Sequence, residues 1–235
     1  MREIFTKIQD DELLSIEIET DASQYKDEYS WLFSVFVKYD AKDKATLKYE
    51  EFLEIKESLI IAVEYEGKAK YIGSRIIDGW SEFYFCASSA KELNPLVTSM
   101  LKDTGYAYES NIIKDRKWNF YETVLFPTEL EQIHMQSEKI IFLLQEEEDD
   151  VSISRDVEHY VSFTTPTQKD KFLVALNLEG FSYKDDISNE EFENGVALIK
   201  NHSVSSKVVE EIINALFVII KEHHGYYEGW STSLA

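Results

Sequence analysis

The sequence contains a single cysteine, few basic residues and no long apolar run. Cys86 alone excludes an internal disulfide and a cysteine-based zinc site. No apolar stretch approaches the roughly 18 residues that cross a bilayer, and the N-terminus lacks the hydrophobic core of a signal peptide. We therefore expect a cytoplasmic protein that has no membrane segment and keeps Cys86 as a buried thiol on a strand.

The shortage of positive charge limits the class of partner. The chain has 24 Lys and Arg residues against 45 Asp and Glu, a net charge of −21, with −8 in residues 1–125 and −13 in residues 126–235. Because a surface with this much negative charge repels phosphate backbones, direct binding to RNA or DNA is not expected. The acidity either attracts a protein partner with a basic surface or serves solubility alone.

A strand-helix-strand pattern occurs twice in the chain, at residues 82–109 and 158–185. Each copy has a strand, a polar cap, a helix that ends at a glycine (Gly105 or Gly180), and an aromatic strand. With 44% hydrophobic residues in 235, each half of the chain can bury a core of its own. The repetition therefore predicts two domains with one folding pattern.

Polar residues predict where both repeated helices begin. Ser89 is followed by Glu92, and Thr165 is followed by Gln168, so both pairs have the spacing of a capping box. Pro166 stands at the first helical position of the second copy. We expect helices at residues 90–104 and 166–179.

The remaining periodicity completes the same order of elements in both halves. The first half predicts strands at 29–39, 70–77, 81–88 and 106–113 and helices at 48–66 and 90–104, with a hairpin turn at Asp78-Gly79 and residues 13–19 as an edge strand beside 29–39. The second half predicts strands at 159–164, 181–185, 196–201 and 226–234 and helices at 166–179 and 206–222. We therefore predict an α+β protein of two tandem ferredoxin-like (β-α-β-β-α-β) domains, with antiparallel sheets and helices on one face.

Two segments lie around the junction of the predicted domains, 1–125 and 150–235. Residues 115–125 are rich in aromatics and are expected to be extended, either prolonging the last strand or bridging to the next domain. Residues 126–149 then form a linking helix, which Pro127 opens, and an acidic loop. The acidic run at 146–150 is either a solvated loop or a docking segment for a basic partner.

Two motifs in the second half resemble a known family. The segment RDVEHYVSF at 155–163 resembles the signature R-[ED]-V-[ED]-H-[WY]-x-x-F of the RraB family, regulators of RNase E activity, and GYYEGWST at 225–232 is similar to that family's G-x-Y-[DE]-G-W-x-T. Gly180-Phe181 falls where the family has its own G-[FY]. The first half resembles the uncharacterised bacterial domain often fused to such modules.

The resemblance implies a ferredoxin-like domain that binds a ribonuclease and restrains it without catalysis. This chain departs from the family at Ser154, where proline is frequent, and at His223-His224, where small residues are expected. These departures leave the partner's identity open. The function expected is therefore that of a non-catalytic regulator that acts by protein-protein binding, with a ribonuclease as partner.

Four residues of the two signatures are candidates for partner binding: Arg155, His159, Glu228 and Trp230, since Trp and Arg dominate binding hot spots. On structural grounds Arg155 and Glu158 are expected to form an ion pair, His159 to be hydrogen-bonded at the start of its strand, and Trp230 to cap the sheet end. The first and fourth strands are expected at the two edges of the sheet, so that the signatures do not have to meet.

Catalysis, cofactors and metals are not expected. His223 and His224 are adjacent, so they do not converge with Glu222 and Glu228 on one metal ion, and no phosphate-binding loop or nucleophile motif is present. An alternative function is a small-molecule-binding or hydrolytic role in a cleft between the domains, near residues 118–121. Exposed edge strands also permit a homodimer.

Overall fold

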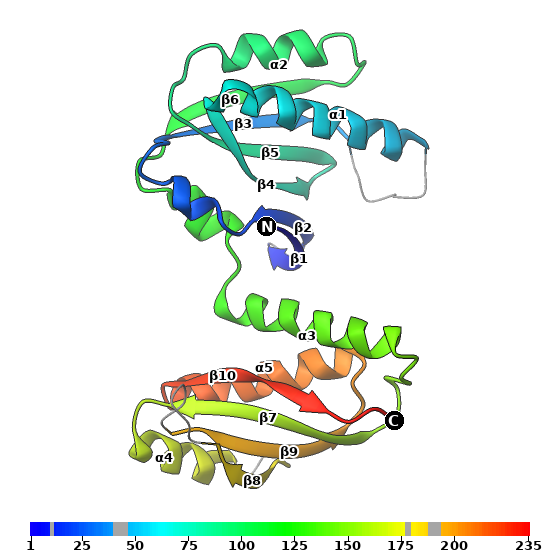
Figure 1. Ribbon diagram of the computed structural model, residues 1–235, viewed down its shortest axis with the longest axis vertical. Helices are drawn as coiled ribbons and strands as arrows, with labels where there is room; N and C mark the ends of the chain where they lie inside the picture. Colours follow the sequence, from blue (N-terminus) through cyan, green and yellow to red (C-terminus); the bar gives the residue numbers. More distant parts are fainter. Residues whose placement is uncertain (10–11, 40–46, 177–179, 188–193) are drawn as a thin grey trace. The chain divides into compact units, whose positions relative to one another are not determined.

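The computed structural model describes residues 1–9, 12–39, 47–176, 180–187 and 194–235 (Figure 1). Its contacts divide the chain into two units, Met1–Pro127 and Thr128–Ala235. Each unit is an antiparallel sheet with α-helices packed against it, so the predicted α+β class is confirmed.

The first unit contains a six-stranded sheet in the order β1-β2-β4-β5-β3-β6. Its elements are β1 Arg2–Gln9, β2 Glu12–Glu19, β3 Trp31–Val37, α1 Leu47–Glu64, β4 Ala69–Ile77, β5 Trp80–Ala87, α2 Leu93–Leu101 and β6 Tyr108–Lys114. The strand order β4-β5-β3-β6 is that of a ferredoxin-like sheet, to which β1 and β2 add a hairpin. The expectation that residues 13–19 pair with 29–39 was wrong, because β3 already has β5 and β6 on its two sides and β2 pairs with β1 and β4.

A tight turn joins β4 to β5 as predicted. Ile77 pairs with Trp80, and the two residues between them, Asp78 and Gly79, have φ angles of 51° and 71°. Positive φ at both central positions is the requirement of a type I′ turn, whose twist matches that of the strands it joins. The Asp-Gly pair therefore sets the register of this hairpin.

Both faces of the first sheet are covered. Helices α1 and α2 bury one face through Phe52, Leu59 and Val97, which pack with Phe33 and Phe85 of the sheet. The opposite face receives the aromatic segment at 115–125, in which Phe120 packs on Tyr84 with ring centroids 4.4 Å apart, while Trp118 and Tyr121 are buried.

The aromatic segment is helical, and the prediction that it is extended was wrong. Tyr121–Leu125 forms a π-helical turn, and the Asp115 carboxylate accepts hydrogen bonds from the backbone N–H groups of Asn119 and Phe120. Aromatic residues suit strands, yet here they are better buried by a short helix that lies across a finished sheet.

The second unit has a four-stranded sheet in the order β10-β7-β9-β8, which is also ferredoxin-like. Its elements are α3 Glu129–Glu146, β7 Arg155–Phe163, α4 Pro166–Leu176, β8 Ser182–Asp186, β9 Val196–His202, α5 Ser206–Glu222 and β10 Gly225–Thr232. Residues 177–179, where the helix after Thr165 was expected to end, lie outside the described residues. Helix α3 belongs to this core, because Ile133 and Ile141 are buried with Val161 and Ile213.

The side chains of β7 alternate between two faces of this sheet. The inner face, turned toward the helices, carries Val157, Val161 and Phe163, which are at most 3% exposed. The outer face carries Asp156, Glu158, Tyr160 and Ser162 of β7 with Tyr226, Glu228 and Ser231 of β10. Helices α3, α4 and α5 all pack on the inner face. In the described part of this unit, none of them packs on the outer face.

One of the two predicted repeat caps is present. The Thr165 backbone N–H donates to Gln168 Oε1 (3.0 Å) and the Gln168 N–H donates to Thr165 Oγ1 (3.3 Å), which confirms the capping box of α4. The predicted cap at Ser89 was wrong, because α2 begins later, at Leu93, after Glu92 has taken a left-handed φ of 71°. The matching spacing there is therefore a coincidence of composition.

A second capping box, at Thr128 and Glu131, starts α3, and its removal provides a stability test. We expect Thr128→Ala to lower the free energy of unfolding of the second unit by about 1 kcal/mol, because one backbone donor loses its acceptor. Urea denaturation measures the change. Ser205→Ala is the matched control, since Ser205 precedes α5 without a side-chain cap bond, and an equal loss in both variants would contradict the role of the cap.

Candidate functional site

The two signature segments lie side by side on neighbouring strands. Strand β7 is central and pairs with β10 from Gly225 opposite Phe163 to Thr232 opposite Val157. The expectation that they occupy opposite edges was wrong, because the first strand of a ferredoxin-like sheet is internal. The two motifs therefore form one continuous structural site with an inner and an outer face.

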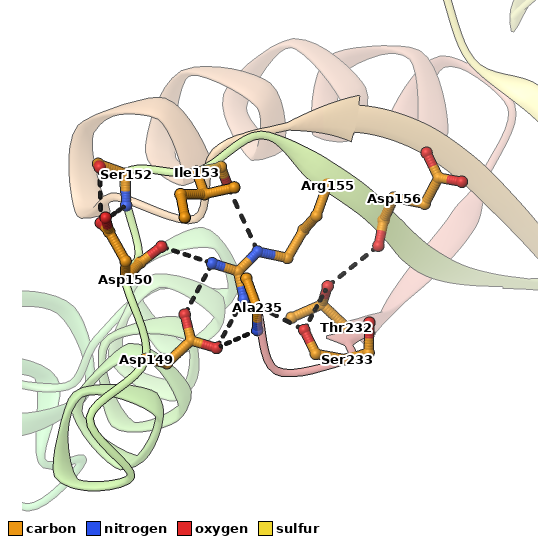
Figure 2. A network of polar contacts seen from close by, with 9 residues as sticks. All are labelled: Asp149, Asp150, Ser152, Ile153, Arg155, Asp156, Thr232, Ser233 and Ala235. Atoms are coloured by element: carbon orange, nitrogen blue, oxygen red, sulfur yellow. Dashed lines mark hydrogen bonds and ion pairs between the residues drawn. The ribbon is translucent and has the colours of Figure 1, made fainter.

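On the inner face, Arg155 closes a polar network with the loop after α3 (Figure 2). Its guanidinium makes two hydrogen bonds of 2.7 Å to the Asp149 carboxylate and further bonds to the carbonyl oxygens of Asp150 (2.6 Å) and Ser233 (3.1 Å). Asp149 also accepts the backbone N–H of Ala235 at 2.9 Å. These bonds connect the start of β7 with the loop before it and the residues after β10.

The network corrects two expectations about charge. Arg155 pairs with Asp149 and not with Glu158, which lies on the outer face and pairs with Lys184. The acidic run at 146–150 was expected to be a solvated loop or a docking segment; its other four residues are exposed, but the Asp149 side chain is fully buried. Hydrogen bonds from Arg155 lower the pKa of the Asp149 carboxyl, so the pair stays ionised at neutral pH.

His159 is fully buried in the middle of the inner face. Its Nδ1 lies 2.9 Å from the Tyr227 hydroxyl and its Nε2 lies 3.1 Å from Nε2 of His202. Burial, together with the neighbouring His202 and Lys200, lowers the pKa of His159 to about 3. The expected hydrogen-bonded structural histidine is thus present, with partners on both adjacent strands.

Trp230 connects β10 to α3. Its indole is 5% exposed and donates a hydrogen bond of 3.0 Å to Ser137 Oγ, which itself donates to the Ile133 carbonyl at 2.9 Å. The indole therefore lies in the core, where it fastens α3 to the sheet, and does not cap the sheet end.

Two glycines of the second signature have different structural roles, close packing at Gly225 and a positive φ at Gly229. A Cβ on Gly225 would lie 2.4 Å from the Phe163 ring, so glycine is needed for that aromatic to lie against β10. Gly229 has a φ of 126° and follows Glu228, the extra residue of a β-bulge. The bulge returns Trp230 to the same face as Tyr227.

The outer face is polar and aromatic. Tyr160 OH lies 2.7 Å from Ser231 Oγ and donates to Glu158 Oε2 at 3.3 Å, while Ser162 Oγ donates to Glu228. Tyr226 is 53% exposed beside them. The carboxylates of Asp156, Glu158 and Glu228 make this face acidic, with Lys184 as a neighbouring cation.

The structure thus separates the four candidates for partner binding. Arg155, His159 and Trp230 are buried on the inner face, each with its own hydrogen-bond partners, and Glu228 is exposed on the outer face. Their role in partner binding stays a prediction. Sequence reasoning missed Ser137, Asp149, His202 and Tyr227; for Tyr227 and His202 the signal was available, since Tyr227 alternates with the exposed Tyr226 and His202 has the same phase as Val196 and Leu198 of β9.

The aromatic segment that prompted the alternative function has a packing role in the first unit. Trp118 Nε1 donates to the Tyr29 carbonyl at 2.7 Å, and Tyr121 OH donates to the Glu19 carbonyl at 2.8 Å. Both rings are at most 3% exposed. These residues are satisfied within their own unit, so they do not favour a binding role.

The cysteine, candidate metal ligands and helix lengths give no further functional site in the described residues. Cys86 is buried as expected, and burial raises the pKa of its thiol to about 12. Among the described residues, no three His, Cys, Asp or Glu side chains are placed to hold a metal ion. The helices in the described part of the chain are too short or too polar to span a membrane.

Comparison with known families divides the chain as its structure does. The model of RraB, described as Regulator of ribonuclease activity B, matches residues 134–232. The model of DUF695, described as a family of unknown function, matches residues 3–126. The resemblance expected for each half is confirmed, and no curated protein matches the chain.

Two solved structures align with most of the chain. One is a protein from Bacteroides thetaiotaomicron, with 11% identity over 85% of this chain and 92% of that chain and a TM-score of 0.19. The other is an unknown protein from Galdieria sulphuraria, with 10% identity over 88% and 98% and a TM-score of 0.21. At such TM-scores neither structure supports a conclusion.

Proposed function

Because the chain belongs to the DUF695 family of unknown function through residues 3–126, and residues 134–232 match the RraB regulators of ribonuclease activity, we propose that it is a non-catalytic regulator that binds a ribonuclease. The second unit carries the binding activity in this proposal. A cytoplasmic location is part of it.

The outer face of the second unit supports this proposal as its binding surface. The outer face of the first sheet is covered by the aromatic segment of its own unit, through Trp118, Phe120 and Tyr121. The equivalent face of the second sheet exposes Glu228 from the family signature, beside Tyr226, which stands at one of the variable positions of that signature. Signature residues that are turned to solvent have no core to pack, which favours a role in recognition.

Charge indicates the kind of surface that would meet it. The chain carries a net charge of −21, and Asp156, Glu158 and Glu228 lie on the outer face. A ribonuclease segment rich in Lys and Arg would be attracted to this face, faster at low salt than at high salt. The buried candidates Arg155, His159 and Trp230 would support the surface from beneath, and Glu228 would contact the partner.

A capture experiment tests the proposal. The immobilised chain is exposed to lysate of the source organism at low salt, and captured ribonuclease is identified and then assayed for RNA cleavage with and without added chain. We expect a ribonuclease to be captured and its cleavage rate to fall. Capture of no ribonuclease, or cleavage that the chain leaves unchanged, would contradict the proposal.

Charge reversal then locates the surface. We expect the double variant Glu158→Lys/Glu228→Lys to weaken capture at least about tenfold, because two attractive contacts become repulsive. Glu210→Lys, an exposed position on α5, is the matched control and should bind as the parent chain does. Thermal unfolding of all three proteins checks that the fold is kept, and equal weakening by the control would exclude the outer face as the binding surface.

A homodimer stays a prediction, which light scattering checks.

A further inference from the structure

A chain of four groups crosses three strands of the second unit and has only one arrangement of protons. His202 Nδ1 lies 2.7 Å from the Ser203 carbonyl, which only accepts, so Nδ1 must carry the proton. A neutral His202 then has Nε2 as an acceptor, so His159 Nε2, 3.1 Å away, must donate to it. His159 Nδ1 is left as an acceptor for the Tyr227 hydroxyl at 2.9 Å.

An added proton breaks this arrangement at either imidazole. On His202 Nε2 it would place two N–H donors against each other at 3.1 Å. A proton added to His159 Nδ1 would make this nitrogen a donor to the Tyr227 oxygen. The buried Tyr227 O–H would then have lost its hydrogen-bond acceptor. Either event also creates a positive charge in a region shielded from water.

The groups that face the pair do not compensate such a charge. Lys200 of β9 is a second cation, and Arg155 of β7, the register partner of His202, has its charge matched by Asp149. Tyr227 of β10 is neutral, and burial raises its pKa. Among the described residues, the buried side chains that α3, α4 and α5 turn to the sheet are apolar apart from Ser137.

Two imidazoles that meet through Nε2 also resemble two ligands of a metal ion. Protein zinc sites use at least three protein ligands. Within the described ranges no further His, Cys, Asp or Glu completes such a set. The hydrogen-bonded chain accounts for all four ring nitrogens without an ion.

We propose that the Tyr227–His159–His202–Ser203 chain is an acid-sensitive lock, which holds β10, β7 and β9 together while both imidazoles are neutral and loosens this sheet as the pH falls. The lock is independent of any ribonuclease. It sits directly beneath the outer face, so that surface would change with the protonation of residues that solvent hardly reaches.

The direction of the pH effect follows from linkage. Burial lowers the pKa of both imidazoles below the ordinary value of 6.5. The unfolded chain therefore takes up protons first as the pH falls below 6.5, so the stabilisation is complete above that pH and is lost progressively below it. A histidine that stays neutral in the folded unit shifts the folding equilibrium by about 30-fold between pH 7.5 and pH 5.

Amide hydrogen exchange measured by mass spectrometry tests the lock in the intact chain. The first unit is an internal reference, because all five histidines lie beyond residue 127. After correction for intrinsic exchange, we expect peptides from β7, β9 and β10 to lose about 30-fold or more protection between pH 7.5 and pH 5, relative to β3 and β5. His202→Gln should shrink this difference, whereas His134→Gln, which changes an α3 side chain bonded to Asn214, should not.

A second measurement on the unmodified chain keeps the proposal testable if His202→Gln does not fold. Imidazole ¹⁵N shifts at pH 7.5 should identify His159 as the Nε2–H tautomer and His202 as the Nδ1–H tautomer. The opposite tautomers, a titration of either ring near pH 6.5 in the folded chain, or an equal loss of protection in both units would overturn the proposal.

Discussion

Trp230→Ala is expected to lower the free energy of unfolding of the second unit by about 3–5 kcal/mol, the cost of removing a large buried aromatic side chain. The indole is 5% exposed, packs between β10 and α3, and donates its N–H to Ser137. Its loss leaves a cavity together with a hydroxyl that has lost its donor. Urea denaturation followed by amide NMR signals of the second unit measures the change.

Two further variants separate packing from hydrogen bonding at this position. Trp230→Phe keeps most of the ring volume and should cost about 1–2 kcal/mol, while Tyr226→Ala on the exposed side of the same strand should cost less than about 0.5 kcal/mol. If Trp230→Ala and Tyr226→Ala lowered the free energy of unfolding equally, the result would contradict the burial of the Trp230 indole. A loss of partner binding in Trp230→Ala would therefore be explained by destabilisation of the second unit, and not by the loss of a direct contact with the partner.

Arg155→Met is expected to lower the melting temperature of the second unit by on the order of 10 °C, because it leaves a buried carboxylate without its partner. The guanidinium also bonds to the carbonyl groups of Asp150 and Ser233, so three segments lose a common donor. Differential scanning calorimetry measures the shift. The depressed pKa of Asp149 predicts that the stabilisation is present above pH 3.8 and is lost as the pH falls further.

The double variant Arg155→Met/Asp149→Leu tests the cause. It removes both charges, so we expect it to recover a large part of the loss in melting temperature. Lys184→Met is the control, because its pair with Glu158 is exposed and contributes little. No recovery in the double variant would show that shape, and not the unpaired charge, dominates at this position.

Local chemistry was sufficient to predict the β-α-β-β-α-β order within each unit. The Asp78-Gly79 turn, the Thr165 capping box and the apolar periodicity of α1 and α5 all depend on residues near each other in the chain. The order of strands in a sheet does not, because it depends on which edges remain free when distant strands meet. For this reason β2 was placed beside β3, and β7 was placed at an edge.

Hairpin β1-β2 shows another limit. Residues 13–19 alternate and were recognised as a strand, but β1 mixes charged and apolar residues and pairs with β2 alone. Segment β1 is a strand because it pairs with β2, and not because of its own sequence pattern. The segment at 115–125 was misjudged for a related reason, since its aromatics are buried by a sheet that lies far away in sequence.

Within the site, strand periodicity could have corrected one error. Arg155 and Glu158 are three residues apart on one strand, so they point to opposite faces and cannot pair. The true partner, Asp149, lies outside the strand in a run of five acidic residues, and no local rule distinguishes it from its neighbours. Ser137 is equally hidden, because its bond to Trp230 depends on where α3 packs.

The bulge at Glu228 also restricts how β10 can assemble. Its eight residues are matched to only seven positions of β7, and the surplus is absorbed where Gly229 tolerates a φ of 126°. Sliding the strand by one residue would ask tryptophan or glutamate to adopt that angle and would turn every following side chain over. Backbone geometry at Gly229 therefore disfavours pairings of β10 with β7 in a shifted register, independently of side-chain packing.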